Sequence, residues 1–272
     1  MYYTYNLKRQ TSGSTDMLRS YVIPAQSFLL DEELAPSLLS LHTALRSVAE
    51  ELKQSGTQIL LLVSAGWVTP NAFSVGACSR YVGVLQENFI GTLSYQYQGA
   101  PQHAQVLVER GADASLPVRL VTDTCELDAS SVVALNALRL GDEIQVVPLS
   151  ICPLSLRESH RWGRVLAETV AMWGKPVALL VAGGLSGRID HRAITTVSAE
   201  GKQHDEQVLR VLQKRTWQDL LNIDPLLSAR AQPVGGLHHL AVFSGFAQQA
   251  REVQVLSYQG IVGTGNAVIR CV

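Results

Sequence analysis

The sequence has few charged residues, no concentration of basic residues and no apolar run long enough to cross a membrane. Charged residues make up 17% of the chain, below the roughly 25% of an average soluble domain. The formal net charge is −1 and the 22 lysines and arginines are scattered, so the basic stripe that binds nucleic acid or anionic lipid is missing. The longest apolar run, residues 59–65, is far shorter than the ~20 residues of a membrane helix.

Closely spaced cysteines are also missing. Cys78, Cys125, Cys152 and Cys271 stand far apart, with no Cys-x-x-Cys pair among them. In a chain of this length, such spacing argues against a zinc site and favours reduced thiols that serve as small core residues. The first 17 residues contain no apolar segment typical of a secretory signal, so we expect a cytoplasmic protein.

The low charge has two explanations that composition does not separate. The hydrophobic fraction is 47% over 272 residues, which is enough for one large core. Alternatively, part of the surface is buried against partner chains, which also lowers the need for charged side chains.

The apolar pattern predicts strands that alternate with helices. Leu38, Leu41, Leu45, Val48 and Leu52 recur at spacings of three and four residues, which indicates an amphipathic helix. Strands are predicted at residues 20–23, 58–65, 118–123, 144–151 and 177–184, and as a pair in the tail around Gly263 and Gly265. Further helices are predicted over 129–141, through Trp162 and Val170, from an N-cap at Asp205 through Leu220, and over 236–249.

This alternation predicts an α/β fold. We expect one domain over residues 1–272, with a central, largely parallel or mixed sheet flanked by helices on both faces. Residues 1–20 are polar and form a possible arm. Ligands of such sheets bind beyond the carboxyl ends of the strands, which places a candidate site at residues 24–26, 64–67, after Val121 and at 183–187.

Four strand-end segments carry a resemblance to a known family. They are "VIPAQSFLL" from Val22, "VSAGWVTPNAF" from Val63, "CELDASSVVALNAL" from Cys125 followed by "IQVVPLSI", and "VAGGLSGRID" from Val181. Their order and approximate spacing resemble the class III extradiol ring-cleavage dioxygenases, the superfamily of the protocatechuate 4,5-dioxygenase β subunit. In active members, each segment carries one histidine. Those of the first two segments bind iron, and those of the last two serve as acid, base or substrate contacts.

The histidines of that pattern are absent from this sequence. The matching positions are Ala25, Gly66, Ala129 and Gly187. The residues that frame them remain, namely Pro24, Trp67, Leu127 with Asp128, and Leu185 with Ser186. Gln26 matches the first position if the register slips by one residue, but a neutral amide is a poor iron ligand. Chemistry like that of the family needs Fe(II) held by two histidines and one carboxylate, so the sequence predicts no catalytic, cofactor-binding or metal-binding residues in this chain.

Other side chains offer alternatives to this interpretation. The family's carboxylate position falls near residues 236–243, where the aligned residue is His239, with His238 beside it. Adjacent residues on a helix project about 100° apart, so the simplest interpretation is a pair of surface or interface histidines. His191, with Asp190 beside it, follows Gly187 by four residues and provides a candidate for a rebuilt metal site.

Two further motifs lack features that their functions require. Ser186 lies in "GGLSGR", where an arginine replaces the final glycine of a nucleophile elbow, and no positioned base accompanies it. The turn "GTGNA" at 263–267 lacks the spacing and the strand-to-helix position of a dinucleotide-binding loop.

The pattern of lost histidines most resembles the α subunit of 2-aminophenol 1,6-dioxygenases. That resemblance implies a structural, non-catalytic subunit in an α₂β₂ assembly, whose homologous β subunit holds Fe(II) and opens the ring of 2-aminophenol or a substituted relative. Two alternatives stay open. One is an active ring-cleavage enzyme whose site is rebuilt from His191, His238 or His239, and the other is a stand-alone binding protein that uses the vestigial pocket.

Overall fold

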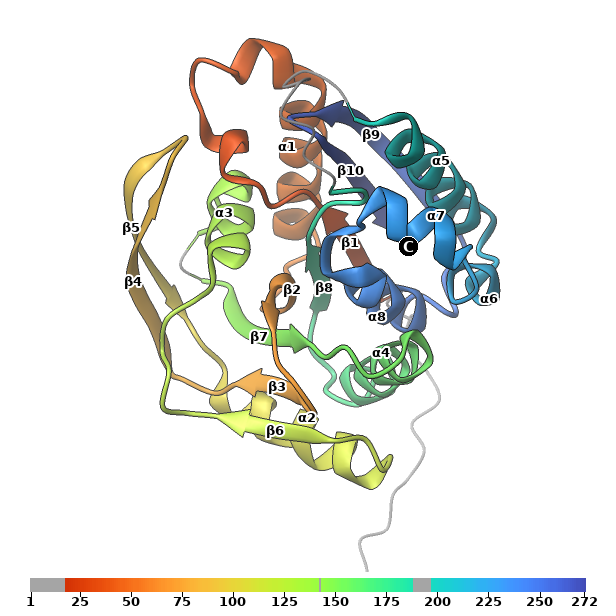
Figure 1. Ribbon diagram of the computed structural model, residues 1–272. Helices are drawn as coiled ribbons and strands as arrows, with labels where there is room; N and C mark the ends of the chain where they lie inside the picture. Colours follow the sequence, from red (N-terminus) through yellow and green to blue (C-terminus); the bar gives the residue numbers. More distant parts are fainter. Residues whose placement is uncertain (1–17, 142, 188–196) are drawn as a thin grey trace, which may run out of the picture.

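The computed structural model describes residues 18–141, 143–187 and 197–272, which form a mixed sheet between two layers of helices (Figure 1). Within these residues the sheet has eight strands in the order β6-β3-β7-β2-β8-β1-β10-β9. The strands are β1 (Arg19–Ile23), β2 (Ile59–Val68), β3 (Phe73–Gly76), β6 (Val118–Val121), β7 (Gln145–Ile151), β8 (Val177–Ala182), β9 (Val253–Ile261) and β10 (Thr264–Cys271). The predicted α/β class is confirmed.

The four central strands are parallel, and the flanking strands make the sheet mixed. β7, β2, β8 and β1 run in the same direction. β3 pairs antiparallel to β7 at one side, while β10 pairs antiparallel to β1 and β9 at the other. The carboxyl ends of the central strands therefore meet at one edge of the sheet, where the predicted site lies.

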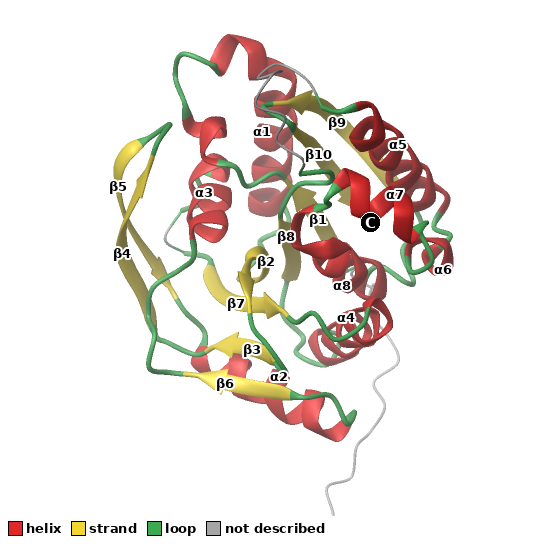
Figure 2. Ribbon diagram, viewed as in Figure 1, coloured by secondary structure: helices red, strands yellow, loops and turns green. Residues whose placement is uncertain are grey.

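Helices cover both faces of the sheet (Figure 2). The helices are α1 (Leu39–Gln54), α2 (Pro101–Asp113), α3 (Ala129–Leu138), α4 (Leu156–Val170), α5 (Ala199–Lys214), α6 (Trp217–Leu220), α7 (Pro225–Ala231) and α8 (His238–Phe246). Short 3₁₀ turns precede α1 and α8: η1 (Ser27–Leu30), η2 (Ala35–Leu38) and η3 (Val234–Leu237). Alternate residues of β2 enter different cores, Leu61 with α2, α4, α5 and α8, and Leu60 with α1 and α3. Burial on both faces explains why the central strands are continuous apolar runs.

The predicted N-cap at Asp205 is wrong. α5 begins after Ser198, whose side chain accepts a hydrogen bond from the Gly201 amide, and it ends at Lys214. Asp205 lies inside the helix, and Leu220 belongs to the separate α6. Both Ser and Asp are good cap residues, so the residue type alone did not locate the helix start.

The region between β2 and β6, which the apolar pattern left without a predicted element, contains β3, α2 and a separate hairpin. β4 (Arg80–Glu87) and β5 (Gly91–Gln98) pair antiparallel to form this two-stranded ribbon. Its inner side chains, including Tyr81 and Tyr95, join the core under α3, and its outer face is exposed. A ribbon with one solvated face is built from alternating polar and apolar residues and lacks the long apolar runs that marked the central strands.

The prediction of four reduced thiols is wrong for two cysteines. Cys78 and Cys125 form a disulfide with a Cα–Cα distance of 5.6 Å. They are 47 residues apart in the chain, but β3 pairs in parallel with β6, which sets Gly76 beside Val121 and brings the following loops together. This pairing was not visible in the sequence spacing. Cys152 and Cys271 are free and buried, as predicted.

The N-terminal arm remains a prediction, since residues 1–17 lie outside the described residues and Arg19 and Ser20 already belong to β1. Within the described part of the chain, no helix combines the length and apolar character needed to span a membrane.

The contact between α4 and α8 depends on two glycines. A Cβ on Gly163 would lie 2.0 Å from the Val242 carbonyl oxygen, and one on Gly245 would lie 1.9 Å from that of His160. We expect Gly163→Ala to destabilise the fold by about 3 kcal/mol because the helices must separate. Urea unfolding measures this effect. Gly141→Ala is the control, since its nearest neighbour is 3.7 Å away. An equal effect of both changes would contradict the role of the helix contact.

Candidate functional site

The predicted site segments converge at the carboxyl ends of β1, β2 and β8, beside the starts of α3 and α8. Gly66, at the end of β2, lies against Asp128 and Ser130 at the start of α3. Gly183, after β8, lies against Ala65 and His239, and Gly184 lies against Gln26. The segments that carry the family's histidine positions therefore lie beside one another.

A side chain at Gly66, which is exposed at the end of β2, would meet two side chains at the start of α3. A Cβ at this position would lie 2.6 Å from Ser130 Oγ and 2.7 Å from Asp128 Oδ1. Asp128 is held firmly, because Ser64 Oγ donates to its Oδ1 (2.6 Å) and Ser131 Oγ donates to its Oδ2 (2.6 Å). The Ser131 amide also donates to Asp128 Oδ1, which makes Asp128 the N-cap of α3. A residue larger than glycine at position 66 requires this cap to move.

Gly187 is closed in by the segment that precedes α8. A Cβ at Gly187 would lie 2.9 Å from the Gln232 carbonyl oxygen and 3.1 Å from Val234 Cγ2. Two backbone hydrogen bonds fix this contact: the Gly187 amide donates to the Ala231 carbonyl (3.2 Å) and the Val234 amide donates to the Leu185 carbonyl (2.8 Å). The turn after β8 and the segment at residues 231–234 therefore form one unit.

His239 is fully buried, so the prediction of a surface or interface histidine is wrong for it. Its Nε2 lies 3.0 Å from the Gly184 carbonyl oxygen and donates to it in the tautomer that carries the proton there. Its Nδ1 has no hydrogen-bond partner among the described residues and faces the backbone of Gly235. Burial lowers the pKa of His239 from 6.5 to about 4, so the imidazole is neutral at pH 7.

His238 is half-buried and points elsewhere. Its Nδ1 lies 2.9 Å from Ser159 Oγ on α4, whereas His239 points to the turn after β8. Burial also lowers the pKa of His238. The two imidazoles do not face one metal, as the helical spacing predicted.

The described residues do not fit an iron centre of the family's type. Ala25 and Gly66 carry no donor atom, and Nε2 of His239 is engaged by Gly184. Among residues 18–141, 143–187 and 197–272, no group of three histidine, cysteine or carboxylate side chains is placed to share a metal ion. Asp190 and His191, the other candidates, lie outside the described residues.

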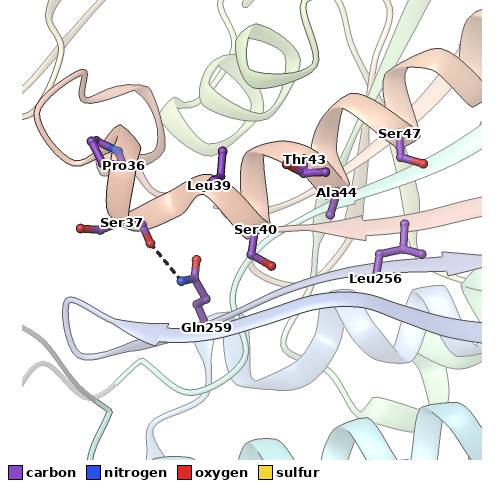
Figure 3. Close-up of a pocket in the computed structure, with 9 residues that line it drawn as sticks. All are labelled: Pro36, Ser37, Leu39, Ser40, Thr43, Ala44, Ser47, Leu256 and Gln259. Carbon is purple, nitrogen blue, oxygen red and sulfur yellow. Dashed lines mark hydrogen bonds between the residues drawn. The ribbon is translucent and has the colours of Figure 1, made fainter.

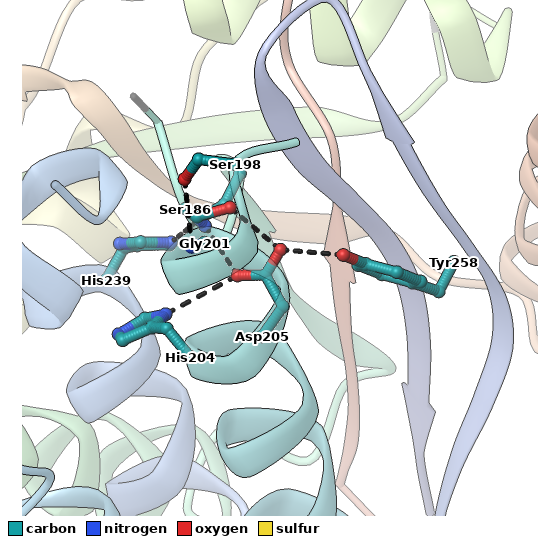
Figure 4. Close-up of polar contacts among 8 residues, drawn as sticks. Ser186, Ser198, Gly201, His204, Asp205, His239 and Tyr258 are labelled. Atoms are coloured by element: carbon teal, nitrogen blue, oxygen red, sulfur yellow. Dashed lines mark hydrogen bonds and ion pairs between the residues drawn. The ribbon is translucent and has the colours of Figure 1, made fainter. Parts of the chain in front are cut away.

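Ser186 takes part in a buried network around Asp205 (Figure 4). The amide and Oγ of Ser186 each donate to the Asp205 carboxylate at 2.8 Å, and Tyr258 Oη donates to it at 2.8 Å. His204 Nδ1 lies 3.4 Å from the same carboxylate. Ser186 Oγ donates to this carboxylate and is completely buried, so it serves as an anchor of the turn and is not presented to a substrate as a nucleophile would be.

Asp205 was missed as a site residue because its sequence position resembled a helix cap. Asp205 is fully buried. The pKa of Tyr258 is raised mainly because Tyr258 is itself buried, and further by the negative charge of Asp205. A Cβ on Gly265 would lie 1.8 Å from Asp205 Oδ2. Gly265 in β10 leaves space for this carboxylate, and this glycine is the feature of the sequence that could have pointed to Asp205.

A cavity of about 540 Å³ lies beside Gly66. Trp67 and Asp128 line it from the candidate site, and Arg119 and Glu126 line it as well. Trp67 therefore borders this adjoining cavity, which combines an aromatic ring with charges of both signs.

Asp205→Asn tests the buried network. Because the amide nitrogen of asparagine cannot accept the hydrogen bonds that the second carboxylate oxygen accepts, we expect a loss of about 3 kcal/mol in the free energy of unfolding. Tyr258→Phe is the matched control, since it removes one donor only, and should cost about 1 kcal/mol. Urea unfolding measures both. Equal costs would show that Asp205 does not hold the Ser186 turn.

Burial of His239 predicts acid sensitivity. The unfolded chain binds a proton near pH 6.5 and the folded chain only near pH 4, so stability falls as the pH falls through this window. Between pH 7.5 and 5 this contribution is about 2 kcal/mol. We expect His239→Gln to lose correspondingly less stability than the wild type over this range, measured by urea unfolding at both pH values. Parallel pH profiles would count against the assignment.

Comparison with known proteins places this geometry in a family. The family model described as "Catalytic LigB subunit of aromatic ring-opening dioxygenase" matches residues 30–269. Among solved structures, an uncharacterized protein from Escherichia coli K12 is similar, with a TM-score of 0.72, 18% sequence identity, and coverage of 93% of this chain and 99% of that chain. At this identity the likeness shows a shared fold. No curated protein matched the chain. The chain belongs to the family of the catalytic LigB subunit of aromatic ring-opening dioxygenases.

Proposed function

We propose that this LigB-family chain is a non-catalytic subunit of an Fe(II)-dependent ring-opening dioxygenase, and that a homologous catalytic subunit holds the iron. The observation that carries the proposal is steric. At Gly66 and Gly187, where the resemblance expects histidines, neighbouring atoms lie within 3 Å of where a side chain would begin. A histidine at either position would require these neighbours to move, which supports a chain without the family's ligand and acid–base residue.

This closure distinguishes the chain from an enzyme that has lost its ligands by substitution alone. Loss of histidines without rearrangement would leave space at each position, because packed structures relax only partly around a deleted side chain. Here, the Asp128 cap occupies the space beside Gly66 and the segment at 231–234 occupies the space beside Gly187. The packing supports a chain whose fold is maintained without the metal.

The finer identity rests on the sequence resemblance. The pattern of replaced histidines is similar to that of the α subunit of 2-aminophenol 1,6-dioxygenases, which suggests an α₂β₂ complex acting on 2-aminophenol or a substituted relative. In such a complex, this chain would contribute an interface, and the β subunit would contribute the iron and the ring cleavage.

One observation favours a second function. The cavity of about 540 Å³ beside Gly66 is lined by Trp67 and by charged side chains, the composition of a small-molecule site. A stand-alone binding protein would use this cavity, and isothermal titration with 2-aminophenol measures that activity. Ring cleavage at a rebuilt site would instead need donors from Asp190 or His191.

The metal content of the purified chain tests the proposed function. We expect the chain expressed alone to bind no stoichiometric Fe(II) and to leave 2-aminophenol uncleaved, since the described residues offer no ligand set. Co-expressed with a homologue that keeps the histidines, it should co-purify in a complex whose iron equals the number of catalytic chains. Metal analysis and absorbance of the ring-opened product give the two readouts.

Two outcomes would contradict the proposal. Tight binding of one iron by the isolated chain, with ring cleavage, would show a rebuilt site. Failure to associate with such a homologue, together with micromolar binding of an aromatic ligand, would favour the binding protein. As a control, His239→Gln should leave the iron content of the complex unchanged.

A further inference from the structure

The two edges of the eight-stranded sheet differ in chemistry. β6 has four residues, with Arg119 inside it and Pro117 before it, and both features discourage pairing with another strand. β9, at the opposite edge, has nine residues, "VQVLSYQGI", with neither charge nor proline. The one irregularity of β9 is the register shift at Leu256, and an uncharged edge segment beyond it is a ready partner for another strand.

The helix beside β9 continues this uncharged surface (Figure 3). A groove of about 690 Å³ runs between the start of α1 and β9, and none of the described residues that line it is charged. Leu39 is 64% exposed at its rim. Ser40, Thr43 and Ser47 form the helical side of the groove and Leu256 the strand side.

Hydrogen bonds fix α1 to β9 and keep the surface in one shape. Ser40 Oγ lies 2.8 Å from Ser257 Oγ, and Gln259 Nε2 donates to the Ser37 carbonyl oxygen at 3.0 Å. The β9–β10 register shifts between Val268 and Ile269, which leaves Ser257–Ile261 as the longest regular part of the edge. The groove begins at Leu256, next to this segment, and reaches Gln259 within it. A surface ordered in advance costs less conformational entropy on binding.

We propose that the surface formed by β9 and the uncharged face of α1 binds a second copy of this chain, with the two β9 strands pairing antiparallel. In a dimer with two-fold symmetry, this surface packs against the same surface of the second copy. Any charged residue on it would therefore lie near a residue of the same charge and weaken the dimer. This patch carries none. Antiparallel pairing of a strand with itself obeys the same two-fold symmetry and satisfies backbone groups that are otherwise left to water.

This surface meets the candidate site only through Tyr258, which donates to Asp205, and the proposal does not rest on the proposed function. A homodimer through β9 is compatible with a partner subunit elsewhere on the chain, and it is expected whether or not that partner exists. The two proposals therefore fail separately.

The mass of the chain in solution tests the proposal. We expect sedimentation equilibrium of the full chain to show a dimer at high concentration. Leu39→Glu with Thr43→Glu should weaken the dimer on the order of tenfold or more, because two acidic groups then face their copies. Lys53→Glu is the matched control, because Lys53 is exposed on α1 and lines a different cavity, and it should leave the dimer unchanged. Circular dichroism confirms that each variant folds.

Hydrogen exchange supplies the strand-level readout. In the dimer, amides of Ser257–Ile261 that β10 does not bind should exchange at least tenfold more slowly than in the double variant. A monomer at all concentrations, a dimer unaffected by the double variant, or equal exchange in both proteins would each overturn the proposal. Protection of β9 that arises only in a complex with the homologous catalytic chain would also overturn it, and would assign the surface to that chain.

Discussion

A single buried carboxylate, that of Asp205, holds together the parts of the molecule that frame the candidate site. It accepts hydrogen bonds from the turn after β8, through Ser186, and from β9, through Tyr258. The turn at residues 185–187 also forms backbone hydrogen bonds with the segment at residues 231–234, before α8. Because an unpartnered buried carboxylate is costly, the donors and the acceptor depend on one another. This dependence explains how a turn typical of an active site persists around Gly187, which has no side chain.

Glycine has an unusual meaning at this site. At position 66 or 187, glycine could be the simple loss of a catalytic histidine, but atoms within 3 Å of the place of a Cβ mean that a larger residue would require its neighbours to move. Gly265 has the same relation to Asp205. Two of the family's histidine positions are therefore packed against structure, in which Asp128 and Ser186 serve as a helix cap and a turn anchor, while a cavity remains beside Trp67. The family fold and the family chemistry are separable in this chain.

The sequence predicted those features that depend on local pattern. The central strands and α1 were found because burial on two faces or on one stripe leaves a clear apolar period. The lack of a metal-ligating side chain at Ala25 and Gly66 was also evident from the sequence. What failed depends on contacts between distant residues. The Cys78–Cys125 bond follows from β3–β6 pairing, the burial of His239 follows from the approach of Gly235, and the role of Asp205 follows from three elements that meet only in the fold.

The bond between Cys78 and Cys125 also changes how the periphery of the molecule can open. It closes a ring that contains β4, β5 and α2, and its far end lies in the loop that leads to Asp128. Fraying of the exposed ribbon therefore cannot carry that loop away from the body, since the loop remains tied to the end of β3. Enclosing 47 residues also removes disorder from the unfolded chain, by about 4 kcal/mol in the entropic model. Reduction of this disulfide by thiols would thus release the loop that leads to Asp128 from the end of β3.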